Sequence, residues 1–216
     1  MDFSLDDDLI MIRDGVSRFI TDNYGFEARR ELIDSDDGFS RNNWRRFAEL
    51  GWLGAALPEE AGGIGMGPRA SMVIMGELGK GLVVEPYLAT VILGGELIAR
   101  YGSQAQRDEI LPQIAAGEIM LTLAHAEPGA RYDLHGIATK AAPSGDGYVI
   151  NGAKGMVLNA AGADRIIIPA RTSGDRSDKS GISLFLVNGD APGLSRHDYK
   201  TYDGGRASEL ELTDVA

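Results

Sequence analysis

Cysteine is absent from the 216-residue chain. Its absence excludes a disulfide framework, a thiolate metal site and a cysteine nucleophile. Proteins without disulfides are typical of reducing compartments. The sequence therefore favours a cytoplasmic location.

An excess of basic residues is also absent. The 21 Lys and Arg residues stand against 32 Asp and Glu residues, which gives a formal net charge of −11. Nucleic acids and anionic membranes are bound by clustered Lys and Arg, and the chain contains no polybasic run. We therefore expect no nucleic-acid partner.

Long apolar runs are absent as well. No run approaches the roughly 18 residues that a membrane-spanning helix needs, so we expect no membrane span. The first ten residues contain Asp2, Asp6, Asp7 and Asp8. They lack the basic start and apolar block of a secretory signal.

What is present is the composition of a globular protein, with 44% hydrophobic and 25% charged residues. The pattern changes within residues 121–136. Before this stretch the apolar residues recur at helical spacing, and after it they alternate or form short β-branched blocks. We therefore predict a multidomain α+β protein, with an all-α helical bundle over residues 1–118 and a β domain over residues 119–216.

The helical half contains five candidate helices. The first has an amphipathic stripe from Leu5 to Ile20 with Ser4 as the expected N-cap. The polar stretch 23–38 has the composition of a loop. The other candidate helices cover residues 40–51, 68–80, 86–102 and 103–117. In the last of these, Ser103 and Gln106 form a capping-box pattern. Helices joined by such short loops predict a bundle.

The β half contains short candidate strands separated by Gly and Pro residues. They cover residues 121–126, 137–142, 148–151, 156–159, 165–172, 182–187, 194–199 and 209–213. The sequence Ser-Gly-Asp-Gly at 144–147 is a strong hairpin signal. Strands at this spacing predict a small antiparallel β-barrel or sandwich.

Residues 121–136 are of interest for function because the expected strand ends in a turn at Glu127-Pro128-Gly129. A turn at the end of a strand presents backbone groups and side chains outward, so such positions often carry ligand contacts. Here the sequence resembles a known family. Residues 123–133 read LAHAEPGARYD. Flavin-dependent acyl-CoA dehydrogenases have a similar segment, in which an aromatic residue is followed by A-x-T-E-P-x-A-G-S-D. The two can be matched position by position, although several letters differ.

A second segment extends the resemblance. Residues 151–159 read NGAKGMVLN and are similar to the family segment N-G-x-K-x-W-I-T-N, followed as in the family by Ala163-Asp164 and Ala170-Arg171-Thr172. With a helical region ahead of both segments, the resemblance covers the whole chain. Within the family, the sequence resembles the subgroup typified by the small subunit of pimeloyl-CoA dehydrogenase, in which a His before the Glu and an Arg-Tyr-Asp-Leu after it also occur.

The resemblance implies FAD-dependent α,β-dehydrogenation of an acyl-CoA, with an electron-transferring flavoprotein as the electron acceptor. Family members continue into a C-terminal four-helix domain that supplies the catalytic Glu. We expect that domain to be absent here and the β domain to be incomplete at its C-terminal end. No catalytic residue is therefore assigned. We expect the chain alone to be inactive and to form a homo-oligomer or a hetero-oligomer with a large acyl-CoA dehydrogenase subunit.

The resemblance also implies which residues contact FAD. They are Leu123, His125, Ala126, Tyr132, Met156 and Leu158. Ala126 replaces a Thr whose hydroxyl binds the flavin ring, and Tyr132 replaces a Ser that binds the pyrophosphate. Met156 replaces a Trp that packs on the flavin, and Leu158 replaces a Thr that reaches flavin N5. These replacements predict a degenerate flavin site or one that depends on a partner.

Arg131 and Tyr132 are the expected contacts for a phosphate of FAD or of the acyl-CoA substrate, because a guanidinium pairs well with phosphate. A simpler alternative is that Arg131 and Asp133 form only a local surface pair. His135 and His197 have no neighbouring metal-ligand types, so no metal site is expected.

The strand residues have simpler interpretations too. Met156 and Leu158 could be inward-facing residues of a barrel strand. His125 shares a strand face with Leu121 and Leu123, which favours a hydrogen-bonded core histidine or a cofactor-facing one over a catalytic one.

Two other functions stay open beside the dehydrogenase. One is a non-catalytic scaffold subunit of a heteromeric acyl-CoA dehydrogenase. The other is a flavin oxidase or monooxygenase of the same fold.

Overall fold

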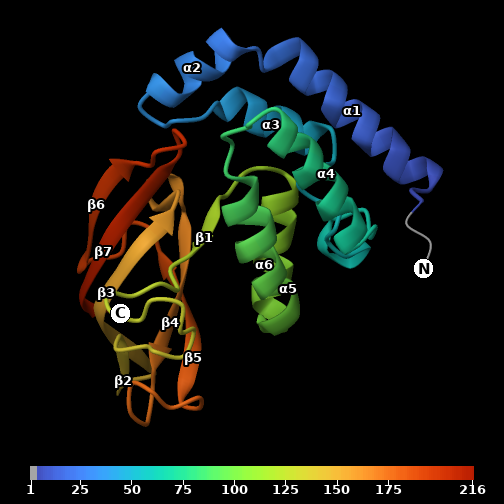
Figure 1. Cartoon of the computed structure of the whole chain (residues 1–216). Coiled ribbons are helices and arrows are strands. Elements are labelled where there is room, and N and C mark those ends of the chain that lie inside the picture. Colours follow the sequence, from blue (N-terminus) through green and yellow to red (C-terminus); the bar gives the residue numbers. More distant parts are fainter. Residues whose placement is uncertain (1–3) are drawn as a thin grey trace. The chain divides into compact units, whose positions relative to one another are not determined.

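The structure of the chain is a computed structural model that describes residues 4–216. It divides into two compact units, of which the first ends at Ile119 and the second begins at Met120. The first unit is helical and the second is a β-sheet (Figure 1). Residues 1–3 of the predicted helical bundle, Asp2 included, lie outside the described residues. The predicted order of a helical region followed by a β domain is confirmed.

The helical unit is built from elements that follow each other closely along the chain. They are α1 (Asp7–Asn23), α2 (Phe26–Asp34), α3 (Arg41–Glu49), η1 (Glu59–Ala61), α4 (Pro68–Lys80), η2 (Leu88–Gly95), α5 (Glu96–Tyr101) and α6 (Gln104–Ala115). Most of these elements follow one another closely, and the longer connections are residues 50–58 and 81–87.

The helix starts follow local capping chemistry. The Ser40 hydroxyl accepts the Asn43 N–H at the start of α3, and Ser103 and Gln106 form the complete capping box of α6. The capping box of α6 was predicted. At α1 the predicted cap Ser4 is wrong, because the carboxylate of Asp6 accepts the Leu9 N–H instead.

The polar stretch 23–38, predicted as a loop, contains the helix α2. α2 is short, and none of its residues is buried, so this polar stretch has no core contact that would mark it as a helix. The predicted helix over 86–102 is also divided. Its first part is the π-helix η2, which ends at Gly94-Gly95, and only the second part, α5, is an α-helix.

The helical unit contains a cluster of aromatic rings in edge-to-face and tilted contacts. The ring centroid of Phe47 lies 5.3 Å from that of Phe19 and 5.1 Å from that of Trp52. Aromatic pairs at such distances add to the gain from burying their apolar surface. Because these residues come from α1, α3 and the segment after α3, the cluster joins the first half of the unit.

Glu85 is a buried carboxylate in the same unit. It accepts hydrogen bonds from the Tyr24 hydroxyl, from the Asn43 amide at 3.0 Å and from the Ser40 N–H at 3.3 Å. Burial raises the pKa of Glu85 above its usual value, although the hydrogen bonds from Tyr24 and Asn43 act in the opposite direction.

Residues 120–216 fold into a seven-stranded curled sheet. The strands are β1 (Leu121–Leu123), β2 (Lys140–Ser144), β3 (Gly147–Leu158), β4 (Arg165–Arg171), β5 (Ile182–Asn188), β6 (Leu194–Lys200) and β7 (Arg206–Val215). Their order in the sheet is β1-β4-β2-β3-β7-β6, and β5 also pairs with β4. The predicted hairpin at 144–147 is confirmed, since Ser144 pairs with Gly147.

The sheet is mixed, whereas the sequence predicted an antiparallel one. β1 runs parallel to β4, from Leu121 opposite Arg165 to Leu123 opposite Ile167. β2 adds one parallel pairing, Lys140 with Arg171. Tight turns force neighbouring strands to run antiparallel, but a long stretch of chain separates β1 from β4 and leaves their direction free.

Some strand boundaries also differ from the prediction. The predicted strands 148–151 and 156–159 are parts of one strand, β3, because Gly152 and Gly155 produce irregularities in the ladder rather than a break. β1 ends at Leu123 and β2 begins at Lys140, so the expected strands 121–126 and 137–142 are shifted or shortened.

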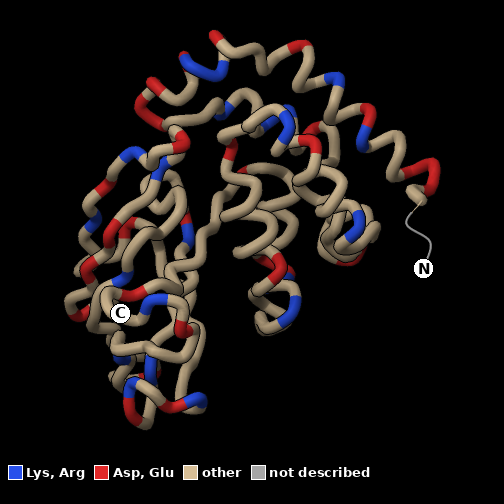
Figure 2. Tube along the Cα trace, viewed as in Figure 1, with Lys and Arg blue, Asp and Glu red and all other residues tan. Residues whose placement is uncertain are grey.

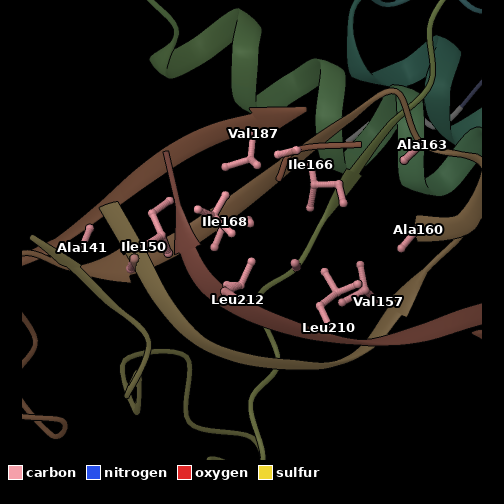
Figure 3. Close-up of a cluster of buried hydrophobic side chains, with 14 residues drawn as sticks. Ala141, Ile150, Val157, Ala160, Ala163, Ile166, Ile168, Val187, Leu210 and Leu212 are labelled. Atoms are coloured by element: carbon pink, nitrogen blue, oxygen red, sulfur yellow. The ribbon is translucent and has the colours of Figure 1, made fainter. Parts of the chain in front are cut away.

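One hydrophobic cluster fills the concave side of the sheet (Figure 3). Ile166 and Ile168 of β4 meet Leu210 and Leu212 of β7, with Val157 of β3 among them. Each such side chain contributes roughly 1.5–3 kcal/mol when it is fully buried. The cluster therefore fixes which residues of β3 point inward and which are left on the opposite face.

Candidate functional site

The two segments that resemble family signatures lie side by side in the β unit. The Gly155 N–H donates to the carbonyl oxygen of Ala126 at 2.9 Å. The Thr122 hydroxyl donates to the carbonyl oxygen of Leu158 at 2.6 Å. Residues separated by about thirty positions in the sequence are therefore joined directly by hydrogen bonds.

A buried ion pair joins the same two segments. Lys154 Nζ lies 2.6 Å from Glu127 Oε1, and the two side chains are only 0% and 3% exposed. Glu127 also accepts the N–H groups of Ala138 at 2.6 Å and Thr139 at 3.1 Å. Lys154 Nζ donates a second bond of 2.6 Å to the carbonyl oxygen of Pro169.

The electrostatics of this pair follow from its contacts. Burial alone would raise the pKa of Glu127, but the hydrogen bonds from Lys154, Thr139 and Ala138 outweigh it and lower the pKa below the usual value. Burial lowers the pKa of Lys154. Because its pKa is lowered, Glu127 contributes stability that is present above the ordinary carboxyl pKa and is lost as the pH falls through the lowered pKa.

The turn after Glu127 is held by Arg171, at the end of β4. Arg171 is 4% exposed, and its guanidinium donates to six backbone carbonyl oxygens. The acceptors belong to His135, Ile137, Ser173, Arg176, Asp178 and Ser180. Arg176 adds bonds to the carbonyl oxygens of Pro128 at 3.0 Å and Gly136 at 3.4 Å. The 128–137 turn is therefore tied to the β4–β5 connection.

A β-bulge lies in β3 at Gly155 and Met156. Lys154 pairs with Leu210 and Val157 pairs with Ser208, so β3 has one residue more than β7 between these pairs. Met156 has the left-handed φ of 52°. The bulge turns Met156 outward with 63% of its surface exposed, while Val157 is 1% exposed in the core.

The predicted cofactor residues in the two segments are distributed as follows. Ala126 and Leu158 are half-buried, as is Leu123 at the end of β1. His125 is exposed, so it is not the hydrogen-bonded core histidine that was one of the two expectations. The alternative in which Met156 faces inward is wrong, because the bulge turns this side chain out of the core.

Arg131 and Tyr132 lie on the turn that follows. Tyr132 is fully exposed, and within residues 4–216 neither side chain makes a hydrogen bond or an ion pair. The alternative pair of Arg131 with Asp133 does not form. Asp133 instead contacts His135, with 2.7 Å between Oδ1 and Nδ1.

Several residues of the site were not singled out from the sequence. Lys154 and Arg171 belong to the segments quoted for the resemblance but had no assigned role, and Glu209 was part of a predicted strand without a role of its own. A signal existed for Lys154 and Arg171: each is a charged side chain within a strand whose neighbours are apolar, which indicates a buried partner. No comparable signal marks Glu209, because its partner depends on the bulge.

The residues present fit an FAD site in part. The Ala126 N–H donates to no acceptor within residues 4–216, and the Arg131 guanidinium and the Tyr132 hydroxyl are likewise available to bind an anion. Met156 and Leu158 add apolar side chains on β3, the strand whose Gly155 N–H binds the Ala126 carbonyl oxygen. Ala126 and Leu158 have no side-chain donor, so two of the hydroxyl contacts expected from the resemblance are missing.

Other kinds of site find less support. No group of three or more His, Asp or Glu side chains within residues 4–216 is arranged to hold a metal ion. None of the helices in that range combines the length and the apolar character needed to cross a bilayer. Figure 2 shows basic and acidic residues interspersed along the described chain rather than separated by sign.

Comparison with known families gives two matches in chain order. Residues 6–118 match the family described as acyl-CoA dehydrogenase, N-terminal domain. Residues 122–215 match the family described as acyl-CoA dehydrogenase, middle domain. Together the two matches cover nearly the whole chain.

Among curated relatives, the chain is 33% identical over 220 residues to the probable acyl-CoA dehydrogenase YngJ of Bacillus subtilis (strain 168). The match covers 100% of this chain and 57% of that protein. The chain therefore spans little more than half the length of this relative.

Among solved structures, the chain is similar to the Tcur3481–Tcur3483 steroid ACAD G363A variant, with a TM-score of 0.88 and 32% identity over 97% of this chain and 55% of that one. It is similar to the ChsE4–ChsE5 complex from Mycobacterium tuberculosis, with a TM-score of 0.88 and 28% identity over 100% of this chain and 56% of that one. It is also similar to an acyl-CoA dehydrogenase complexed with FAD from Bacillus anthracis, with a TM-score of 0.86 and 28% identity over 98% of this chain and 37% of that one.

Proposed function

Because the chain belongs to the acyl-CoA dehydrogenase family, as the matches over residues 6–118 and 122–215 show, we propose that it is a subunit of an FAD-dependent acyl-CoA dehydrogenase. Its β unit contributes one wall of the flavin site, and the assembled enzyme removes hydrogen from the α and β carbons of an acyl-CoA. The observation that carries this proposal is the 2.9 Å hydrogen bond from Gly155 to Ala126, which brings the two signature segments together.

The chain's own residues would hold the cofactor from two sides. The Ala126 N–H binds a polar edge of the ring system, and Met156 covers an aromatic face with its thioether. Arg131 and Tyr132 bind a phosphate of FAD or of the substrate. When bound, FAD supplies the acceptor for the hydride that leaves the β carbon.

Flavin binding by this chain alone is weak in this proposal. Ala126 and Leu158 cannot donate the side-chain hydrogen bonds that a Thr would give at either place, and each such bond contributes about 0.5–1.5 kcal/mol. The α-proton base is a carboxylate outside these 216 residues, in a longer form of the chain or in a partner subunit. The chain alone then has no dehydrogenase activity, and a flavoprotein acceptor takes the electrons from the assembled enzyme.

A second subunit completes the site in our proposal. Two of the similar solved structures are described by paired names, Tcur3481–Tcur3483 and ChsE4–ChsE5, and the first is described as a steroid ACAD. We extend the paired assembly to this chain, with a bulky acyl-CoA as the substrate class. Similarity to the pimeloyl-CoA dehydrogenase subgroup stays a prediction, because the relatives named above do not bear on it.

The visible absorbance spectrum of the purified chain, before and after addition of FAD, tests the proposal. We expect little bound flavin after purification and weak binding of added FAD. The double variant Met156→Trp, Leu158→Thr should bind FAD about tenfold more tightly, since it regains a hydrogen bond and an aromatic face. Leu184→Thr, at an exposed position of β5, is the matched control and should change nothing.

A non-catalytic scaffold subunit is the second candidate, and the missing hydroxyl donors at Ala126 and Leu158 are the observation in its favour. Under that function the double variant gains no affinity for FAD, although co-expression with a large subunit still yields a stable complex. Tight, stoichiometric flavin in the unmodified chain without a partner would instead contradict both the weak-binding proposal and the scaffold.

A further inference from the structure

Glu209 of β7 lies directly against the bulge that carries Met156. Its Oε1 accepts the backbone N–H of Met156 at 3.3 Å and the hydroxyl of Tyr199 at 3.1 Å. The second carboxylate oxygen of Glu209 lies close to Gly155. A Cβ added to Gly155 would lie 2.9 Å from Glu209 Oε2, so the glycine leaves room for the carboxylate.

The bulge needs such a partner for a physical reason. An extra residue in a strand takes its N–H out of the ladder between β3 and β7. Met156 also has a left-handed φ of 52°, a conformation that costs roughly 1–3 kcal/mol for a residue other than glycine. The carboxylate of Glu209 supplies the acceptor that the ladder no longer offers and so stabilises the bulged conformation.

The bulge decides which side chain reaches the outer face. Paired residues of neighbouring strands share a face, and Lys154 pairs with Leu210, a core residue. In a regular strand the alternation would place residue 156 on the core side as well, and residue 157 outside. With the bulge the two exchange places, so Met156 is exposed and Val157 joins the core cluster.

We propose that Glu209 is a positioning residue that holds the Gly155–Met156 bulge and thereby aims Met156 at the outer face beside Ala126, where the flavin is bound. The identity of the ligand as a flavin rests on the proposed function. The role of Glu209 in holding the bulge does not, because it rests on the contacts of Glu209 alone. The bulge is fixed by two hydrogen bonds in this arrangement. The Gly155 N–H donates to the Ala126 carbonyl oxygen, and the N–H of the next residue, Met156, donates to Glu209.

The first test measures the bulge without any cofactor. In the full chain, Glu209→Ala should accelerate hydrogen exchange at the Met156 amide about tenfold, because one charge-assisted hydrogen bond is lost. It should also change the rate at which peroxide oxidises Met156, read by mass spectrometry. Glu209→Gln, which keeps an acceptor oxygen, should restore both rates to within about threefold of the unmodified chain.

Two control variants separate positioning from general destabilisation. Glu211→Ala removes an exposed carboxylate from the same face of β7, two residues further along, and should leave the Met156 rates unchanged. Tyr199→Phe removes the other partner of Glu209 and should have a smaller effect than Glu209→Ala. Unchanged exchange and oxidation at Met156 in Glu209→Ala would overturn the proposal.

The second test uses FAD affinity in the Met156→Trp, Leu158→Thr background. There Glu209→Ala should weaken FAD binding about tenfold and Glu209→Gln should recover most of it. If Met156 responds to Glu209→Ala as expected but no variant binds FAD, the positioning role is supported and the proposed function fails. If FAD binds and Glu209→Ala leaves its affinity unchanged, the positioning role fails and the proposed function stands.

Discussion

Glu127 and Lys154 depend on each other because both are buried. The attraction between two buried charges offsets the cost of removing them from water only while both are present. Each side chain also binds backbone groups. Glu127 accepts the N–H groups of Ala138 and Thr139, and Lys154 donates to the carbonyl oxygen of Pro169. The pair is therefore a point at which a single substitution affects several segments of the β unit.

We predict that Lys154→Met lowers the free energy of unfolding of the β unit by about 3–5 kcal/mol, because it leaves the Glu127 carboxylate buried without its cation. The double variant Lys154→Met, Glu127→Gln should recover part of this loss. Urea denaturation followed by circular dichroism measures both, with the exposed Lys140→Met as the control. A loss below about 1 kcal/mol, in the range of a surface pair, would contradict the prediction.

Glu85 makes the stability of the helical unit depend on pH in the direction opposite to that given by Glu127 in the β unit. Its pKa is raised by burial, so its contribution to stability is complete below the unfolded-state pKa and is lost as the pH rises through the folded-state pKa. We predict that Glu85→Gln, which has no charge to bury, removes this loss. Thermal unfolding at acidic and at mildly alkaline pH checks it, and Glu49→Gln, an exposed carboxylate, should behave like the unmodified chain.

The residue-scale features show what sequence could and could not predict about the site. The likeness to two family segments predicted that Ala126 and Met156 belong to one region, and the hydrogen bond from Gly155 to Ala126 joins those segments. The direction of the Met156 side chain could not be predicted, because it depends on a bulge stabilised by a distant residue, Glu209. Contacts of individual residues with a flavin stay predictions.

Among the elements, the β4–β5 connection and the 128–137 turn form one unit through Arg171. Six carbonyl oxygens converge on its guanidinium, and the side chain is almost fully buried. Carbonyl groups left without a donor inside a protein are costly, so these two loops keep their conformations only while the arginine is present.

We predict that Arg171→Met destabilises the β unit by about 2–4 kcal/mol, because several carbonyl groups lose their donor together. Arg171→Lys should recover little, since an ammonium cannot reproduce the fork of a guanidinium. Hydrogen exchange and limited proteolysis should both increase at residues 128–137 and 173–180. Arg165→Met, whose side chain donates to the neighbouring Asp164 carbonyl, is the control, and equal protection in both variants would refute the prediction.

Most elements with a clear periodicity or cap could be predicted, and the exceptions have common causes. α4 has the predicted bounds because Pro68 begins it and its buried face recurs at helical spacing. α2 could not be predicted because none of its residues is buried. The parallel pairing of β1 with β4 could not be predicted, since strand direction across a long connection leaves no local signal.

At the scale of the whole molecule, the net charge is −11, and basic residues are interspersed with acidic ones in both units rather than clustered, as Figure 2 shows. We predict no binding to duplex DNA at roughly physiological salt, because binding to phosphates requires clustered cations that release counterions. Fluorescence anisotropy of a labelled duplex measures this. Binding that weakens steeply with added salt would contradict it, since that dependence is the signature of phosphate contacts.

The parallel pairing of β1 with β4 also bears on how the chain reaches its native state. Leu121 lies opposite Arg165, and Met120 donates its N–H to Asp164, 44 positions away in the sequence. Closing so long a loop costs entropy before any contact compensates, and topologies rich in distant contacts fold slowly. We expect β1 to dock late in refolding, after the β4–β5 hairpin has formed, which pulse-labelled amide exchange at residues 121–123 would reveal. Newly made chains would then hold the two signature segments apart for longer than the rest of the sheet, and a site for any ligand would mature only at that final step.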